Sequence, residues 1–167
     1  FQLRSQLELD YDVQSLSSVD FDNDGRLDLF ACVYRTKDYS TTQSFLYRDA
    51  VGGGENRLFR NASARTEWQF VDVTSEVGLD EGADRYSLAA SWEDFDNDGD
   101  QDLFVAYRFA PNKLWLNDGE MGFEDVSSSC GIAQDNRRSF GPAFGDFDRD
   151  GLLDLFVANY GYAVDVP

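Results

Sequence analysis

The sequence has no histidine, and its 14 basic residues are far outnumbered by 32 acidic ones. Without histidine the chain cannot form a zinc site with imidazole ligands, a Ser-His-Asp or Cys-His catalytic centre, or a histidine pH switch. The shortage of bases gives a formal net charge of −18. We therefore expect no nucleic-acid partner and no anionic-membrane partner, because both require a basic surface.

Long apolar runs and cysteine are also scarce. No apolar run reaches about 18 residues, so the sequence predicts no transmembrane segment. The chain starts at Phe1 with no signal peptide, and we expect a mature or excised piece of a longer protein. Cys32 lies in an apolar run and Cys130 precedes Gly131. Both are expected to be buried free thiols, and a disulfide between them is the alternative.

Apolar residues are nevertheless plentiful: 42% of the chain is hydrophobic and 15% is aromatic. This is enough for a packed core, so the high charge does not indicate disorder. The length of 167 residues fits one domain or part of one. Among the acids there are 24 Asp and only 8 Glu. Such an excess of Asp points to turns and to short-armed ligands.

One eleven-residue pattern occurs three times, with the frame D-F-D-x-D-G-x-x-D-L-F. Two weaker patterns follow the first two copies, N-x-L-aromatic-x-N and then F-x-D-V-[ST]. The main pattern occupies residues 20–30, 94–104 and 146–156, and the weaker ones occupy residues 56–61, 112–117, 70–74 and 123–127. The repeats predict a modular fold in which each unit contributes the same small structure.

Each unit contains short runs rich in Phe, Val, Leu and Tyr that are bounded by Gly, Asp and Asn, which indicates β-strands. No long window shows helical periodicity. A unit of roughly 50 residues with four short strands fits a β-propeller blade. The fold class is therefore expected to be all-β.

The first two copies of the frame are further apart (94 − 20 = 74 residues) than the second and third (146 − 94 = 52). Most of the difference lies in residues 34–55, which we interpret as an insertion. Its Tyr and Arg residues make it a candidate contact surface, and Gly52, Gly53 and Gly54 at its end predict a flexible hinge. The alternative is a lengthened strand pair that packs its aromatic residues on the blade.

The acidic frame predicts calcium binding. Positions 1, 3, 5 and 9 are Asp in every copy, and position 6 is Gly. Calcium takes six to eight hard oxygen ligands, and alternating Asp on a tightly curled chain points several carboxylates at one centre. Gly permits the sharp turn because it reaches positive φ without strain. The backbone carbonyl of position 7 would add a ligand from Arg26, Asp100 or Leu152.

Three other interpretations of the frame are weaker. An EF-hand needs a Glu at position 12, but Ala31, Val105 and Val157 stand there, and no helix is predicted on either side. Solvated acidic turns would leave four mutually repelling carboxylates within nine residues in all three copies. A catalytic carboxylate pair, as in glycoside cleavage, is asymmetric and does not fit three near-identical loops.

The frame resembles the FG-GAP/VCBS repeat, and the longer pattern is similar to the ASPIC/UnbV and cartilage-acidic-protein-like branch. The resemblance implies four-stranded antiparallel blades whose first two strands are joined by a Ca²⁺-binding loop. It also implies up to three Ca²⁺ ions, held by Asp20, Asp22, Asp24 and Asp28, by Asp94, Asp96, Asp98 and Asp102, and by Asp146, Asp148, Asp150 and Asp154.

The expected organisation is about two and a half blades of a larger propeller, which in this family typically has about seven. The blades are placed at residues 12–75, 84–128 and 138–164, within one partial propeller over residues 1–167. Fewer than four blades do not close a propeller. The chain is therefore expected to be a fragment, or to be completed by the remaining blades or by partner chains.

The expected function is a calcium-stabilised, non-enzymatic scaffold for protein association or adhesion, in an extracellular or periplasmic setting where Ca²⁺ is abundant. One alternative is an accessory propeller of a secreted, polysaccharide-active enzyme. Another is a subunit docked in a larger membrane-associated assembly. Asn61 starts an N-x-[ST] triplet but is interpreted as a strand-end residue, with glycosylation as the alternative.

Overall fold

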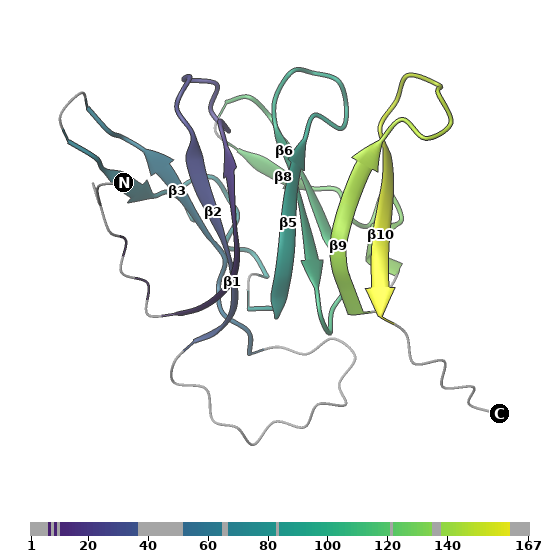
Figure 1. Ribbon diagram of the computed structural model, residues 1–167, viewed down its shortest axis with the longest axis horizontal. Helices are drawn as coiled ribbons and strands as arrows, with labels where there is room; N and C mark the ends of the chain where they lie inside the picture. The colour runs from purple at the N-terminus through teal and green to yellow at the C-terminus, as the bar shows by residue number, and fades with distance from the viewer. Residues whose placement is uncertain are drawn as a thin grey trace, which may run out of the picture.

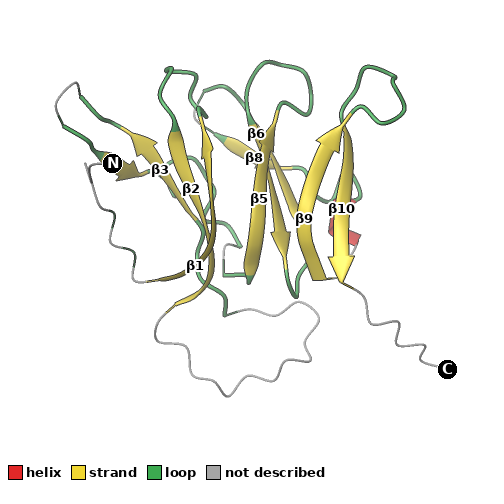
Figure 2. Cartoon of the chain, viewed as in Figure 1, coloured by secondary structure: helices red, strands yellow, loops and turns green. Residues whose placement is uncertain are grey.

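The computed structural model is all-β and describes residues 7, 9, 11–36, 52–64, 67–82, 84–120, 122–134 and 138–160. Three antiparallel sheets stand side by side (Figure 1). The one helical segment among these residues is a short 3-10 turn, η1 (Ile132–Gln134). Figure 2 shows that strands and their connecting loops make up nearly the whole drawn structure. The all-β prediction is confirmed.

The first two sheets have four strands each, and the third has two. Each four-stranded sheet is a simple meander in which neighbours along the chain are neighbours in the sheet. The first sheet comprises β1 (Tyr11–Val19), β2 (Asp28–Thr36), β3 (Arg57–Asn61) and β4 (Phe70–Asp72). The second comprises β5 (Ser87–Glu93), β6 (Asp102–Tyr107), β7 (Lys113–Asn117) and β8 (Phe123–Asp125). The third comprises β9 (Arg138–Gly145) and β10 (Asp154–Tyr160).

The sheets have the architecture expected of propeller blades. The two complete sheets share their register, since Leu29 pairs with Phe59 in the first and Leu103 with Trp115 in the second. The described parts of the chain form no closed barrel. The number of blades in a complete propeller stays a prediction.

The core lies between the sheets. Strand β6 belongs to the middle sheet, and all six of its residues are buried. This explains the continuous apolar run at residues 103–107, because a strand covered on both faces needs no alternation of polar residues. The ring of Phe30 on β2 contacts Trp92 on β5, at 5.7 Å between centroids. Phe104 on β6 makes the matching contact with Phe144 on β9, at 6.0 Å.

The outer face of the third sheet is left open. Phe156 on β10 corresponds to Phe30 and Phe104, yet it is 64% exposed, whereas those two are 1% and 0% exposed. Phe147, at position 2 of the third acidic loop, is 65% exposed, whereas its counterpart Phe21 is 2% exposed. An aromatic pair that is core in the first repeat is therefore surface in the last.

Residues 37–51, most of the predicted insertion, lie outside the described residues. The glycines at its end are described, and the flexible-hinge prediction is wrong for them. The N–H groups of Gly52 and Gly53 donate to the carbonyl of Asp84 at 3.0 and 2.8 Å. A Cβ on Gly53 would lie 2.2 Å from the Arg85 backbone. These glycines therefore permit close approach of two chain segments.

The two cysteines differ from expectation in one respect. Both are free, so the disulfide alternative is wrong. Cys32 is buried as predicted, and burial raises the pKa of its thiol to about 12. Cys130 is exposed because it stands in the turn after β8, outside the sheets. Among the residues described, no helix is long and apolar enough to span a membrane.

Candidate metal centres

The three acidic loops lie at one edge of the molecule, at the top of Figure 1. Each connects the first two strands of its sheet: β1 to β2, β5 to β6 and β9 to β10. The strand pairs place the ninth position of the frame opposite the residue that precedes the first position. In the first loop, Val19 pairs with Asp28, which brings Asp28 beside Asp20.

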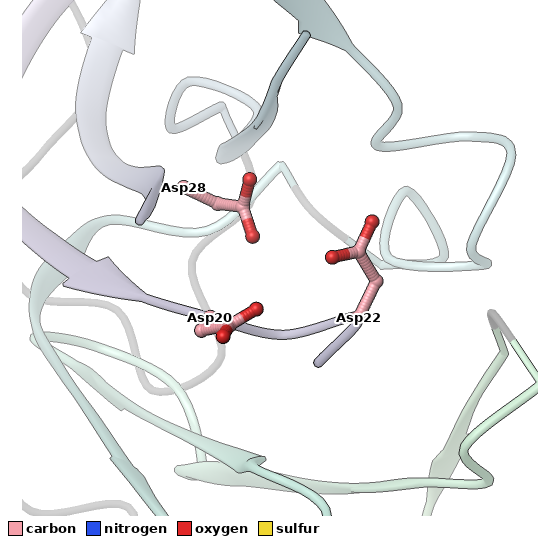
Figure 3. A group of neighbouring side chains, drawn as sticks. All are labelled: Asp20, Asp22 and Asp28. Atoms are coloured by element: carbon pink, nitrogen blue, oxygen red, sulfur yellow. The ribbon is translucent and has the colours of Figure 1, made fainter. Parts of the chain in front are cut away.

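In each loop, three of the four predicted carboxylates come together. One carboxylate oxygen from each of Asp20, Asp22 and Asp28 lies within 4.8 Å of the other two. Figure 3 shows these three side chains around a common space. The same grouping occurs at positions 1, 3 and 9 of the other two loops, namely Asp94, Asp96 and Asp102, and Asp146, Asp148 and Asp154.

The fifth-position carboxylates of Asp24, Asp98 and Asp150 stand outside these groups. Each accepts the backbone N–H of position 7, at 2.8 to 2.9 Å. Asp24 also forms an ion pair with the guanidinium of Arg26. In this arrangement these side chains shape the loop. Ligation by Asp24, Asp98 and Asp150, and by the carbonyls of Arg26, Asp100 and Leu152, stays a prediction.

The loop backbone requires two residues at positive φ. Gly25, Gly99 and Gly151 have φ of +83°, +99° and +89°, and a Cβ on any of them would meet no atom within 4 Å. Gly is therefore required for its backbone conformation and not because a side chain would be crowded. This agrees with the sharp turn predicted from the sequence. Position 4 is left-handed as well, with φ of +54° to +67° at Asn23, Asn97 and Arg149. Sequence reasoning missed this second position, although Asn in two copies was a usable signal.

The ninth-position Asp ties its loop to the third strand of the sheet. Asp28 is fully buried and accepts the N–H of Asn61 at 2.7 Å and that of Phe21 at 3.2 Å. Asp102 is equally buried and accepts the N–H of Asn117 at 2.8 Å and that of Phe95 at 2.7 Å. The closing Asn of the N-x-L-aromatic-x-N pattern thus belongs to the loop assembly, a role that the sequence did not reveal.

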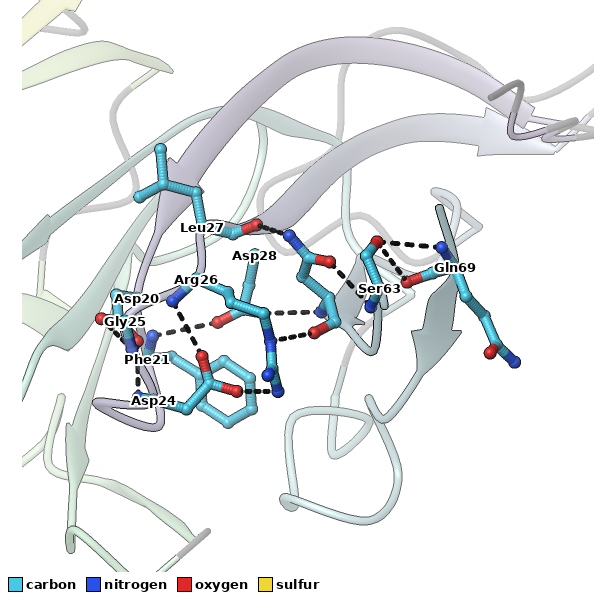
Figure 4. A network of polar contacts seen from close by, with 10 residues as sticks. Asp20, Phe21, Asp24, Gly25, Arg26, Leu27, Asp28, Ser63 and Gln69 are labelled. Atoms are coloured by element: carbon cyan, nitrogen blue, oxygen red, sulfur yellow. Dashed lines mark hydrogen bonds and ion pairs between the residues drawn. The ribbon is translucent and has the colours of Figure 1, made fainter. Parts of the chain in front are cut away.

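Asn61 is a buried strand-end residue, as interpreted from the sequence. Its side-chain amide donates to the carbonyl of Leu27 at 3.0 Å, and the residue is 8% exposed. Figure 4 shows this network around the first loop, including the bonds between Ser63 and Gln69. An amide held in this way is not presented for glycosylation.

The electrostatics of the loops favour a bound cation. Burial raises the pKa of Asp102 to about 6, against two backbone hydrogen bonds that lower it. Burial likewise raises the pKa of Asp28. Burial and then the neighbouring Asp24 raise the pKa of Asp22. A cation placed among these carboxylates would oppose each of these shifts.

One atom of the first loop tests whether the loop suits a bound cation. Oδ1 of Asp22 is buried and has no hydrogen-bond partner. A buried acceptor without a partner costs free energy, and a charged one costs more. This oxygen belongs to a residue that shares the first carboxylate group. Ca²⁺ prefers hard oxygen ligands, and carboxylates are among them, so the residues fit that ion.

Residues 94–157, which hold the second and third acidic loops, match the FG-GAP-like repeat. This confirms the resemblance inferred from the three acidic frames. The matched stretch runs from the first residue of the second loop to β10, so the family pattern coincides with the loop-and-strand unit seen in the structure.

Parts of the chain are also similar to cartilage acidic proteins. The chain is 30% identical to cartilage acidic protein 1 of Xenopus tropicalis over 89 residues, which cover 53% of this chain and 13% of that protein. It is 34% identical to cartilage acidic protein 1 of Mus musculus and of Homo sapiens over 59 residues, which cover 35% of this chain and 9% of each relative. The chain thus spans a small part of these relatives.

Proposed function

We propose that this FG-GAP-like repeat region is a calcium-binding, non-enzymatic scaffold that supports protein association in an extracellular or periplasmic setting. The observation that carries the proposal is the grouping of three carboxylates in each of three loops. The match to FG-GAP-like repeats and the similarity to cartilage acidic proteins support it.

The role of the ion would be structural. Three Ca²⁺ ions would change the formal charge from −18 to about −12, since each adds two positive charges. The triads at positions 1, 3 and 9 would hold the ions. Because Asp28 and Asp102 also bind the third strand of their sheets, an ion at these loops would stabilise the joint between the loop and its sheet.

The absence of enzymatic activity is part of the proposal. The three loops are near copies in both sequence and geometry. General acid and base catalysis needs two carboxyl groups with unlike environments. Three equivalent acid groups at separate sheets do not supply that asymmetry.

Calcium binding is tested by elemental analysis and thermal melting, with and without a chelator. Calcium that binds only the folded state would stabilise it by about 2.7 kcal/mol per site at a hundredfold excess over Kd. Asp96→Asn should lower the calcium content by one ion, whereas the control Glu124→Gln, at an exposed acid of β8, should leave it unchanged. No bound calcium together with an unchanged melting temperature would refute the proposal.

The open face of the third sheet supports the association role. Phe30 and Phe104 are each covered by an aromatic residue two positions before the next acidic loop, Trp92 and Phe144. We expect the face around Phe156 to take a further β-sheet with an aromatic side chain at that position, from a remaining blade or a partner protein. The chain's own first sheet offers Ser18 there, so a second copy is a poor fit.

This surface can be measured with the hydrophobic dye bis-ANS. The protein should bind the dye, and Phe156→Ser should reduce its fluorescence more than the control Leu27→Ser, at a loop residue that is 60% exposed. A polypeptide that carries a complete repeat with the aromatic residue should displace the dye. Equal dye binding by both variants would show that this face is not the contact surface.

A further inference from the structure

A buried chain of hydrogen bonds joins the first acidic loop to the second. Its centre is Asn117, the last residue of β7, whose backbone N–H donates to Asp102 at 2.8 Å. The side-chain amide of Asn117 donates to the carbonyl of Phe21 at 2.8 Å. The N–H of Phe21 in turn donates to Asp28. All four residues are at most 3% exposed, so one candidate ligand of each loop is connected through protected bonds.

A second, exposed contact joins the same two loops. The side-chain amide of Asn23 donates to the carboxylate of Asp100 at 2.6 Å. Asn23 is the left-handed residue at position 4 of the first loop, and Asp100 is position 7 of the second. Phe21 also contacts the ring of Phe123, at 6.3 Å between centroids. The two loops therefore meet both at their base and at their rim.

The third loop lacks the groups that make these contacts. Its position 7 is Leu152, whose side chain cannot accept a hydrogen bond from Asn97, the counterpart of Asn23. Among the described residues, the sheet of β9 and β10 has no third strand, so none of these residues corresponds to Asn117. Within the described ranges, the assigned hydrogen bonds between loops all join the first loop to the second repeat.

We propose that calcium binding at the first and second loops is positively coupled through Asn117 and Asn23, whereas the third loop binds calcium independently. The inference rests on the proposed calcium binding. An ion at one loop would fix Asp28 or Asp102, and the shared bonds through Phe21 and Asn117 would pre-order the other loop. The protein then loses less conformational entropy when the second ion binds, which raises the affinity of that loop for calcium.

Calorimetric calcium titration of three proteins measures the coupling. In Asp96→Asn the second site is disabled, and in Asp148→Asn the third site is disabled by the same change at position 3. The amide NMR signals of Gly25, Gly99 and Gly151 assign each binding event to its loop. We expect Asp96→Asn to weaken binding at the first loop roughly fivefold or more. Asp148→Asn should leave both other loops unchanged.

Matched variants test whether the coupling passes through Asn117 and Asn23. Asn117→Ser and Asn23→Gly each remove one contact between loops, and Gly is tolerated at the left-handed position of Asn23. Their controls are Asn61→Ser and Asn97→Gly, the same changes at the corresponding positions of the other repeat. The effect of Asp96→Asn on the first loop should shrink in the test variants and persist in the controls. Should Asn117→Ser fail to fold, Asn23→Gly alone decides.

The possible failures are distinguishable. If the unaltered protein binds no calcium, the proposed function and the coupling are both wrong. If three ions bind and Asp96→Asn affects the first loop no more than Asp148→Asn does, calcium binding stands and the coupling is refuted. If coupling is present but equal in the test variants and their controls, the assigned route through Asn117 and Asn23 is refuted.

Discussion

The carboxylate of Asp28 accepts the backbone N–H of Asn61, 33 residues later, at 2.7 Å. This bond fixes the first acidic loop to β3, and Asp102 and Asn117 repeat it in the second sheet. In the third loop the described bond to Asp154 comes from within its own loop, from the N–H of Phe147 at 2.9 Å. The loops are thus alike in sequence but differ in how firmly the sheet holds them.

Removing the carboxylate at position 9 of the frame should therefore lower the free energy of unfolding more in the first two repeats than in the third. Asp28→Ala leaves two buried N–H groups without acceptors, and each such group costs about 1–3 kcal/mol. Asp154→Ala exposes its one described donor to water and should cost less. Chemical unfolding of both variants in chelator provides the comparison, and equal losses of stability would contradict the assigned roles.

Asp102 should give the calcium-free protein a distinctive pH dependence. Burial raises its pKa to about 6 in the folded state, above the ordinary value of 3.8. The folded state holds this proton more tightly, so the resulting stability is fully present below about pH 4 and is lost as the pH rises through about 6. The change amounts to roughly 3 kcal/mol. Asp28 and Asp22 also have raised pKa values and remain in Asp102→Asn, so urea unfolding at several pH values should show a larger loss in the unaltered protein than in this variant.

Gly99→Val should destroy the second loop. At φ of +99° a β-branched residue is strained even though there is open space around the Cβ position. We expect loss of one calcium ion and a lower melting temperature. Gly141→Val serves as the control, since Gly141 also has open space but no positive φ. Full calcium stoichiometry in Gly99→Val would show that the loop tolerates another backbone conformation.

Arg149→Asn should stabilise the third loop. Arg149 has φ of +67°, a conformation that Asn adopts more readily, and both other copies have Asn at this position. The expected gain is about 0.5–1 kcal/mol in unfolding free energy. Arg149→Lys keeps both the charge and the strain, so it should give no gain. A gain in Arg149→Lys equal to that in Arg149→Asn would refute the strain argument.

The two thiols should differ in reactivity. Cys32 is buried with a pKa near 12, whereas Cys130 is exposed. A thiolate is the reactive form, so at pH 8 a reagent such as DTNB should modify one thiol in the native protein and two after denaturation. Cys130→Ser should abolish the native reaction. Rapid modification of two thiols without denaturant would show that Cys32 is accessible.

The sequence by itself determined the unit of this protein. Three copies of one frame predicted the strand-loop-strand unit, and the repeated spacing of Asp within each copy predicted that several carboxylates converge in each loop. Gly at position 6 indicated the turn, because local backbone preference decides that position. These features depend on residues within about ten positions of each other, where sequence pattern is most informative.

The tertiary structure decided how the units act on one another. It placed Asn61 and Asn117 on buried carboxylates, set Asp24 apart from the carboxylate group, and brought Asn23 to Asp100 across 77 residues. It also turned the three glycines at 52–54 from an expected hinge into a close contact. Such contacts depend on how one sheet packs against the next. The spacing of residues along the sequence does not give the distance between residues on different sheets.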